Sequence, residues 1–169
     1  GWGEYDEYVV FYISNSSNIL VSDLHLRGYY QGGWNLVGHS VLLKRSNDVT
    51  FNNIYFNGSF WNPCSVTSDP TVSLNQDDIS RRISITNSVF HNIADHSSIL
   101  FCTANEVTIQ NTTAGRIVID CQPFGNSEDV PFEECNNAII KDNTVGGRVD
   151  LQGNGHILSD NYIPYLYPQ

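Results

Sequence analysis

A short unit of alternating apolar and polar residues, closed by an asparagine, returns along the whole chain. In its clearest copy, Val49-Thr50-Phe51-Asn52-Asn53, two apolar residues flank a polar one and Asn53 follows two positions later. Such a unit cannot bury its apolar side alone, but stacked copies can bury it against one another. The repeat therefore restricts the chain to a stacked, solenoid-like architecture.

Six copies align on their polar residue and on their first apolar residue. The aligned polar residues are Asp23, Asn53, Asn87, Asn111, Asn143 and Asn161. The first apolar column is Ile19, Val49, Ile83, Val107, Ile139 and Ile157, and a second runs through Val21, Phe51, Ile85 and Ile109 but breaks at Lys141 and Ser159. We expect the polar column to mark a corner, because Asn tolerates left-handed backbone and its amide can bond to the equivalent side chain one copy away.

A second alternating run, rich in β-branched residues, precedes each copy and is typical of a strand. These first strands begin at Val9, Val41, Val72, Ile99, Ile117 and Val149. Two strands per turn predict an all-β fold, a right-handed single-stranded parallel β-helix of about six coils, in a single domain over residues 1–169. Because the sequence contains no Met, we expect that the chain is processed or is a fragment of a longer solenoid.

Alternation also predicts which side chains of the first strands face outward. One outward column is Val10, Leu42, Ser73, Leu100, Val118 and Asp150, and the other is Tyr12, Lys44, Asn75, Cys102, Asp120 and Gln152. Two Gly-rich and aromatic insertions, 28–39 and 57–70, fall at the same point of the repeat and should project from one side. Insertions on one face of a solenoid often build a binding surface.

Composition narrows the classes of partner. The net charge is −10 and there are only eight Lys and Arg residues, which argues against nucleic acid binding. No run of about 18 apolar residues is present, so we expect no membrane span. A removed leader would suit export, and we expect an extracellular protein of a cell or virion surface.

The four cysteines suit the same location, because they predict two disulfides in an exported chain. Cys121 and Cys135 bracket one insertion, and a bridge between them would leave Cys64 to pair with Cys102, although the other two pairings stay open. Asn15, Asn57 and Asn111 begin N-glycosylation sequons. We expect glycans at Asn15 and Asn57, and expect Asn111 to be buried in the corner column.

The repeat, from about Tyr8 to Ile163, resembles the parallel β-helix repeats of the pectin-lyase-like superfamily. That superfamily includes pectate lyases, polygalacturonases, phage tailspike depolymerases and NosD-like surface proteins. The resemblance implies polysaccharide binding along the outward face of the first strands.

Asn75-Gln76-Asp77-Asp78 is similar to the Asn-Thr-Asp element of polygalacturonases, whose carboxylates provide the acid and the base. This implies Asp77 and Asp78 as catalytic residues. Asp120 is the partner on the same strip, two coils and about 9.6 Å away, a spacing compatible with an inverting hydrolase. However, Cys102-Thr103 stands where the family has an Asp pair, so enzyme status stays open between a hydrolase, a lyase and no catalysis.

The predicted substrate-binding residues combine polar and aromatic side chains. They are Lys44, Arg45 and Asn75 on the outward strip, and Tyr30, Trp34 and Trp61 in the insertions, where flat rings can stack on sugars. No CxxC or His-rich spacing occurs, and we expect neither a metal nor a cofactor. The alternative function is a non-catalytic spike, stalk or filament segment whose end coils pair with another copy, as a homo-oligomer or end to end.

Overall fold

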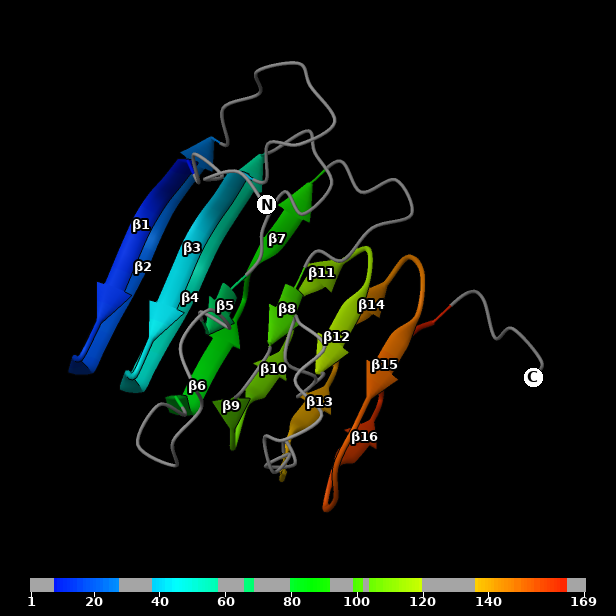
Figure 1. The fold of residues 1–169 in the computed structure, drawn as a ribbon. Coiled ribbons are helices and arrows are strands. Elements are labelled where there is room, and N and C mark those ends of the chain that lie inside the picture. Colours follow the sequence, from blue (N-terminus) through cyan, green and yellow to red (C-terminus); the bar gives the residue numbers. More distant parts are fainter. Residues whose placement is uncertain are drawn as a thin grey trace, which may run out of the picture.

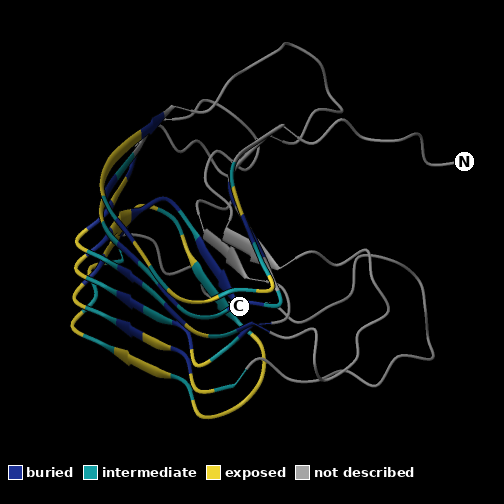
Figure 2. Ribbon diagram, turned by 90° about the vertical axis from the view of Figure 1, so that its left-hand side faces the viewer, coloured by how far each residue is buried: buried dark blue, intermediate teal, exposed yellow. Residues whose placement is uncertain are grey.

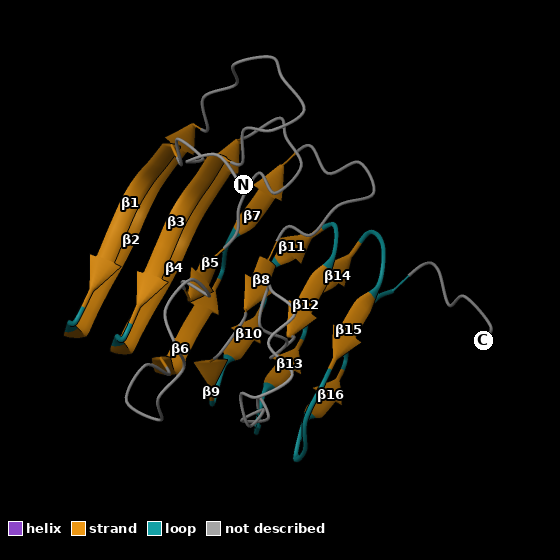
Figure 3. Cartoon of the chain, viewed as in Figure 1, coloured by secondary structure: helices purple, strands orange, loops and turns teal. Residues whose placement is uncertain are grey.

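The computed structural model describes residues 8–27, 38–57, 66–68, 80–91, 99–101, 104–119 and 136–163. Every strand pairing among these residues is parallel, and no helix occurs among them (Figure 3). The described part of the chain is therefore an all-β structure of stacked parallel strands that form a curled sheet.

Two three-stranded sheets hold the first strands of the repeat. One contains β1 (Tyr8–Ser14), β3 (Gly38–Lys44) and β5 (Val66–Ser68), and the other contains β8 (Ile99–Phe101), β12 (Ile117–Ile119) and β15 (Val149–Leu151). Strand β5 lies beside β8, so the six strands follow one another across the molecule (Figure 1).

A ten-stranded sheet holds the second part of every repeat. Its strands are β2 (Ser17–Arg27), β4 (Asn47–Asn57), β6 (Ser80–Thr86), β7 (Val89–His91), β9 (Ala104–Asn105), β10 (Thr108–Gln110), β11 (Thr113–Ala114), β13 (Ile139–Lys141), β14 (Thr144–Val145) and β16 (Ile157–Ser159). The core cluster joins side chains of all three sheets, among them Leu43, Phe51, Ile109 and Ile119, each at most 1% exposed.

The large sheet bends because each repeat contains two residues with left-handed backbone, five positions apart. The first column is Asn18, Asp48, Arg82, Glu106, Asn137 and Gly155, and the second is Asp23, Asn53, Asn87, Asn111, Asp142 and Asp160. All of them have φ between 49° and 72°. Exposed residues gather at the bends of the stack (Figure 2). Left-handed backbone is tolerated by Gly, Asn and Asp, which occupy ten of these twelve positions.

The predicted ladder of corner side chains is present at two steps. The Asn53 amide donates to Asp23 Oδ1 at 2.7 Å, and the Asn111 amide donates to Asn87 Oδ1 at 2.7 Å. The Asn87 amide instead donates to Asn52 Oδ1, one position before the corner. Asn111 is exposed, so the prediction that it is buried is wrong: corner residues in left-handed conformation point their side chains out of the stack.

This ladder alters the titration of one acid. The hydrogen bond from Asn53 lowers the pKa of Asp23, and a hydrogen bond from Ser22 acts in the same direction. A pKa that is lower in the folded state stabilises the fold above the unfolded pKa of Asp, near 3.9, and this contribution is lost as the pH falls through the folded value.

We therefore expect Asn53→Gly to raise the pKa of Asp23 towards its ordinary value. Glycine preserves the left-handed corner and removes only the amide donor. A carboxyl-carbon NMR titration of both proteins measures the change. Asp48 is the internal control, because Arg82 lowers its pKa independently of Asn53; an unchanged Asp23 titration in Asn53→Gly would contradict the ladder.

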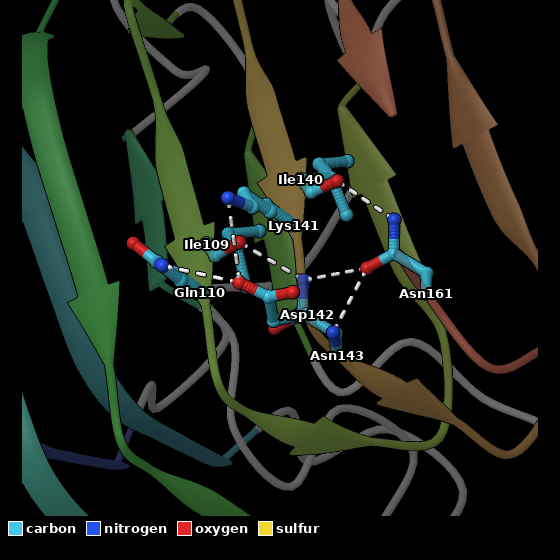
Figure 4. A network of polar contacts seen from close by, with 7 residues as sticks. All are labelled: Ile109, Gln110, Ile140, Lys141, Asp142, Asn143 and Asn161. Carbon is cyan, nitrogen blue, oxygen red and sulfur yellow. Dashed lines mark hydrogen bonds and ion pairs between the residues drawn. The ribbon is translucent and has the colours of Figure 1, made fainter. Parts of the chain in front are cut away.

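A second, buried column lies just inside the outer ladder. Thr112 N–H donates to Asn143 Oδ1 at 2.9 Å, and Asn143 N–H donates to Asn161 Oδ1 at 3.0 Å. The Asn143 amide also donates to the carbonyl of Ile109, and Asn143 is 2% exposed (Figure 4). Side chains of this column thus accept hydrogen bonds from backbone N–H groups of the preceding repeat. Without them, the bend would leave these N–H groups with no partner.

The register of the first strands differs from the prediction. Phe11 lies opposite Val41 and Ile13 opposite Leu43, two residues from the predicted pairing of Val9 with Val41. A slip of two residues keeps every side chain on the same face, so an alternating apolar run does not exclude it. Val66 lies opposite Val41, at the place predicted for Val72, which is outside the described residues.

The last two repeats are shifted by one residue relative to the prediction. Ile109 lies opposite Ile140, so Ala138 and Ile140 enter the core at 1% and 0% exposure while Ile139 is 38% exposed. Alignment of Asn143 and Asn161 with the corner asparagines gives the wrong register. The left-handed residues of these two repeats are Asp142 and Asp160, each one position earlier. The apparent breaks at Lys141 and Ser159 disappear in the true register.

Val118 is an exception among the positions predicted to face outward. It was predicted to face outward and lies beside Asp150 on the neighbouring strand, yet it is only 6% exposed and does not belong to the core cluster. Alternation therefore predicts which face a side chain lies on, but not whether that face is open to solvent.

Candidate functional site

Arg116, Arg148 and Asp150 form a charged group on β12 and β15, called the arginine cluster below. Each arginine immediately precedes a first strand, and Ile117 lies opposite Val149, which places the two arginines at the same level, just before the starts of two adjacent strands. The backbone N–H of Ile117 donates to the carbonyl of Arg148 at 3.1 Å and holds this register.

A glycine precedes each arginine, and the second is required by close packing. The N–H of Gly147 donates to the carbonyl of Gly115 at 2.5 Å, and a Cβ atom at Gly147 would lie 2.7 Å from that carbonyl oxygen. A side chain at Gly147 would separate the two strands, so the Gly-Arg pair positions both guanidinium groups.

Both guanidinium groups meet one carboxylate oxygen. Arg116 Nε donates to Asp150 Oδ2 at 2.7 Å and its Nη2 contacts the same oxygen, while Arg148 Nε lies 3.0 Å from it. Arg116, Asp150 and Arg148 have 26%, 35% and 59% of their side chains exposed. The cluster has a net charge of +1 on a chain of net charge −10, and its outer member is open to solvent.

Planar guanidinium groups donate several hydrogen bonds in fixed directions, which suits carboxylate and hydroxyl oxygens. Asp150 holds the two groups side by side and restricts their rotamers, so less conformational entropy is lost when a ligand binds. The arrangement can therefore bind an oxygen-rich polar ligand, but it contains no paired acid and base for bond cleavage.

The predicted catalytic residues Asp77, Asp78 and Asp120 lie outside the described residues, as do Asn75, Tyr30, Trp34, Trp61 and all four cysteines, Cys64, Cys102, Cys121 and Cys135. Lys44 ends β3, and Arg45 is a half-buried corner residue with φ of 48° between β3 and β4. The strands β5 and β8 separate β3 from β12, so Arg45 does not join the arginine cluster.

Of the two predicted glycosylation sites, Asn15 has a described side chain and Asn57 does not. Asn15 is exposed, and its amide donates to Ser14 Oγ at 2.9 Å, whereas Asn57 ends β4 and its side chain lies outside the described part. Glycans at both positions remain predictions.

Sequence reasoning placed Asp150 in an outward column but missed the two arginines. Their signal was a repeated pattern, Gly115-Arg116-Ile117-Val118-Ile119 and Gly147-Arg148-Val149-Asp150-Leu151, at the start of successive first strands. Charged residues in equivalent positions of two stacked strands must become neighbours, so the pattern could have predicted the cluster.

Within the described ranges, no three His, Cys, Asp or Glu side chains gather as they would around a metal ion. The same part of the chain has no helix that is long and apolar enough to cross a membrane. No protein-family model, curated protein or solved structure gives a significant match to this chain.

Proposed function

We propose that this chain is a right-handed parallel β-helix of about six coils, of the pectin-lyase-like kind, that belongs to an extracellular protein and binds polysaccharide. The parallel register of all the described strands and the two left-handed columns support the fold. Stacked repeats of this type form a stiff, elongated surface that matches an extended polymer.

The arginine cluster is the observation that carries the binding proposal. It lies on the outward side of the first strands, where the guanidinium group of Arg148 is reachable because 59% of its side chain is exposed. Tyr12 lies on the first strand of the series and is 56% exposed, so an aromatic ring is available on β1 as well. Aromatic rings stack on the apolar faces of sugars while charged donors bind their oxygens.

We expect Arg148→Glu to weaken polysaccharide binding at least tenfold. Hydrogen bonds to charged groups contribute about 1.5–3 kcal/mol, and the substitution replaces a donor with a repelling acceptor. Affinity electrophoresis against a panel of polysaccharides measures the change. Arg82→Glu is the matched control, because Arg82 is an exposed arginine paired with an aspartate at a bend of the large sheet.

If wild-type protein were retarded by no polysaccharide in the panel, the proposed function would fail. Equal retardation of wild type and Arg148→Glu would show that the arginine cluster does not bind the polysaccharide. Cleavage is scored separately, as new reducing ends or unsaturated uronate products in wild type and in an Asp77→Asn, Asp78→Asn, Asp120→Asn triple variant. A product lost in that variant would make the protein a hydrolase or lyase.

A second candidate function, a structural segment that assembles end to end, has its own support. Leu158 lies opposite the fully buried Ile140, yet it is 46% exposed, and Ile157 beside it is 55% exposed. Among the described strands, β15 pairs only with β12 and β16 only with β13, so both have an edge that can accept another strand.

Sedimentation velocity over a range of concentrations tests this candidate. We expect association of the wild type that Leu158→Asp abolishes and Ile139→Asp preserves, because Ile139 is also partly exposed but belongs to β13, one strand in from this edge. A wild type that stays monomeric at every concentration would rule it out.

A further inference from the structure

Asn111 differs from the other residues of the outer corner column in one chemical respect. The column consists of Asp23, Asn53, Asn87, Asn111, Asp142 and Asp160, and only Asn111 begins an Asn-x-Ser/Thr sequon, Asn111-Thr112-Thr113. Asn53 and Asn87 have the amide but lack the hydroxyl two residues later.

The corner presents both sequon side chains to solvent. Asn111 is exposed with φ of 49°, and Thr113 is exposed at the start of β11. The residue between them, Thr112, is 2% exposed, and its hydroxyl donates to the carbonyl of Gln110 at 3.0 Å. The middle position of the sequon therefore anchors the corner while the two recognised positions stay accessible.

The ladder uses only one of the two N–H groups of the Asn111 side-chain amide. One N–H of Nδ2 donates to Asn87 Oδ1 at 2.7 Å, and no second acceptor for this nitrogen occurs among the described residues. On the other side, the carboxylate of Asp142 accepts from Gln110 Nε2 at 3.3 Å and contacts Lys141 Nζ at 3.8 Å. A substituent on Nδ2 can thus replace the second hydrogen while the bond to Asn87 remains.

We propose that Asn111 is an N-glycosylation site, and that its oligosaccharide projects from the bend between β10 and β11. The donor is a lipid-linked pyrophosphoryl oligosaccharide. The Nδ2–C1 bond forms as the bond from C1 to the pyrophosphate oxygen breaks, Nδ2 loses one proton, and the lipid pyrophosphate leaves. The inference rests on the extracellular location in the proposed function, because this transfer accompanies export.

Glycopeptide mass spectrometry of the full chain, secreted from eukaryotic cells, tests the site. We expect the peptide containing Asn111 to carry a glycan that peptide N-glycosidase removes, with conversion of Asn111 to aspartate. Thr113→Ala should abolish this glycan and leave the one at Asn15, whereas Thr113→Ser should retain it. These variants leave the corner asparagine and its ladder bond in place, so they do not depend on tolerance of a corner substitution.

The outcomes separate the inference from the proposal beneath it. A glycan at Asn15 with an unmodified Asn111 overturns the inference and leaves the extracellular location standing. A secreted chain with glycans at neither position overturns the inference and also counts against that location. A glycan at Asn111 that persists in Thr113→Ala would overturn its assignment to this sequon.

Discussion

Replacing Asn143 with alanine is expected to lower the free energy of unfolding by about 3–5 kcal/mol. The substitution removes the acceptor of the Thr112 N–H and the donor to the Ile109 carbonyl, inside a corner that is 2% exposed. Each buried polar group left without a partner costs about 1–3 kcal/mol. The loss of the hydrogen bond from the Asn143 amide to Asn161 Oδ1 adds to this cost. The expected loss is a large part of the free energy of unfolding of a typical domain, about 5–15 kcal/mol.

The matched control is Asn111→Gly. Asn111 lies on the adjacent repeat, in the exposed left-handed column next to the buried column that contains Asn143. The substitution also deletes a corner amide, but that amide is exposed and its partners can bond to water. Glycine keeps the left-handed backbone, so we expect a loss of about 1 kcal/mol or less. Urea denaturation gives both values, provided the m-values agree. Equal losses in the two variants would show that the inner column does not support the fold.

The second large effect is expected for Phe51→Ala, at about 3–5 kcal/mol. Phe51 is fully buried in the second apolar column and packs between Val21 and Ile85 of the neighbouring strands. Truncation of a buried aromatic side chain loses its transfer free energy and leaves a cavity that a closely packed core fills only in part.

Leu158→Ala is the control, since Leu158 belongs to the same column through Ile140 but is 46% exposed. We expect it to cost about 1 kcal/mol or less, because little apolar area leaves water there on folding. Thermal and urea unfolding of both variants measure the difference. A Leu158→Ala cost as large as that of Phe51→Ala would mean that another layer covers Leu158 in solution.

Much of the architecture follows from the sequence, because the apolar columns and the corner asparagines repeat at equivalent positions. What alternation cannot determine is the register between long apolar runs, which explains the slip between Val9 and Val41. The first left-handed column, which begins with Asn18, was not predicted, since Arg82 and Glu106 occupy positions where glycine or asparagine would have indicated the conformation.

The candidate face was harder to predict than the fold. The outward columns predicted from alternation included Asp150, but not the flanking arginines, because Arg116 and Arg148 precede the strands and reach the face through their long side chains. The aromatic candidates belong to insertions, where no repeat constrains the chain, and the catalytic candidates Asp77, Asp78 and Asp120 lie outside the described residues. The repeat thus predicts the scaffold, while the residues that bind a ligand depend on departures from it.

The stacking register is the claim on which the face, the corners and both large effects depend. Methyl NOE spectroscopy on protein labelled only at isoleucine δ1 carbons tests it directly, because neighbouring strands of a sheet lie about 4.8 Å apart. We predict cross-peaks from Ile109 to Ile85 and to Ile140, which occupy the same buried column on adjacent strands. A cross-peak from Ile109 to Ile139 in place of Ile140, or none between Ile109 and Ile85, would contradict the account.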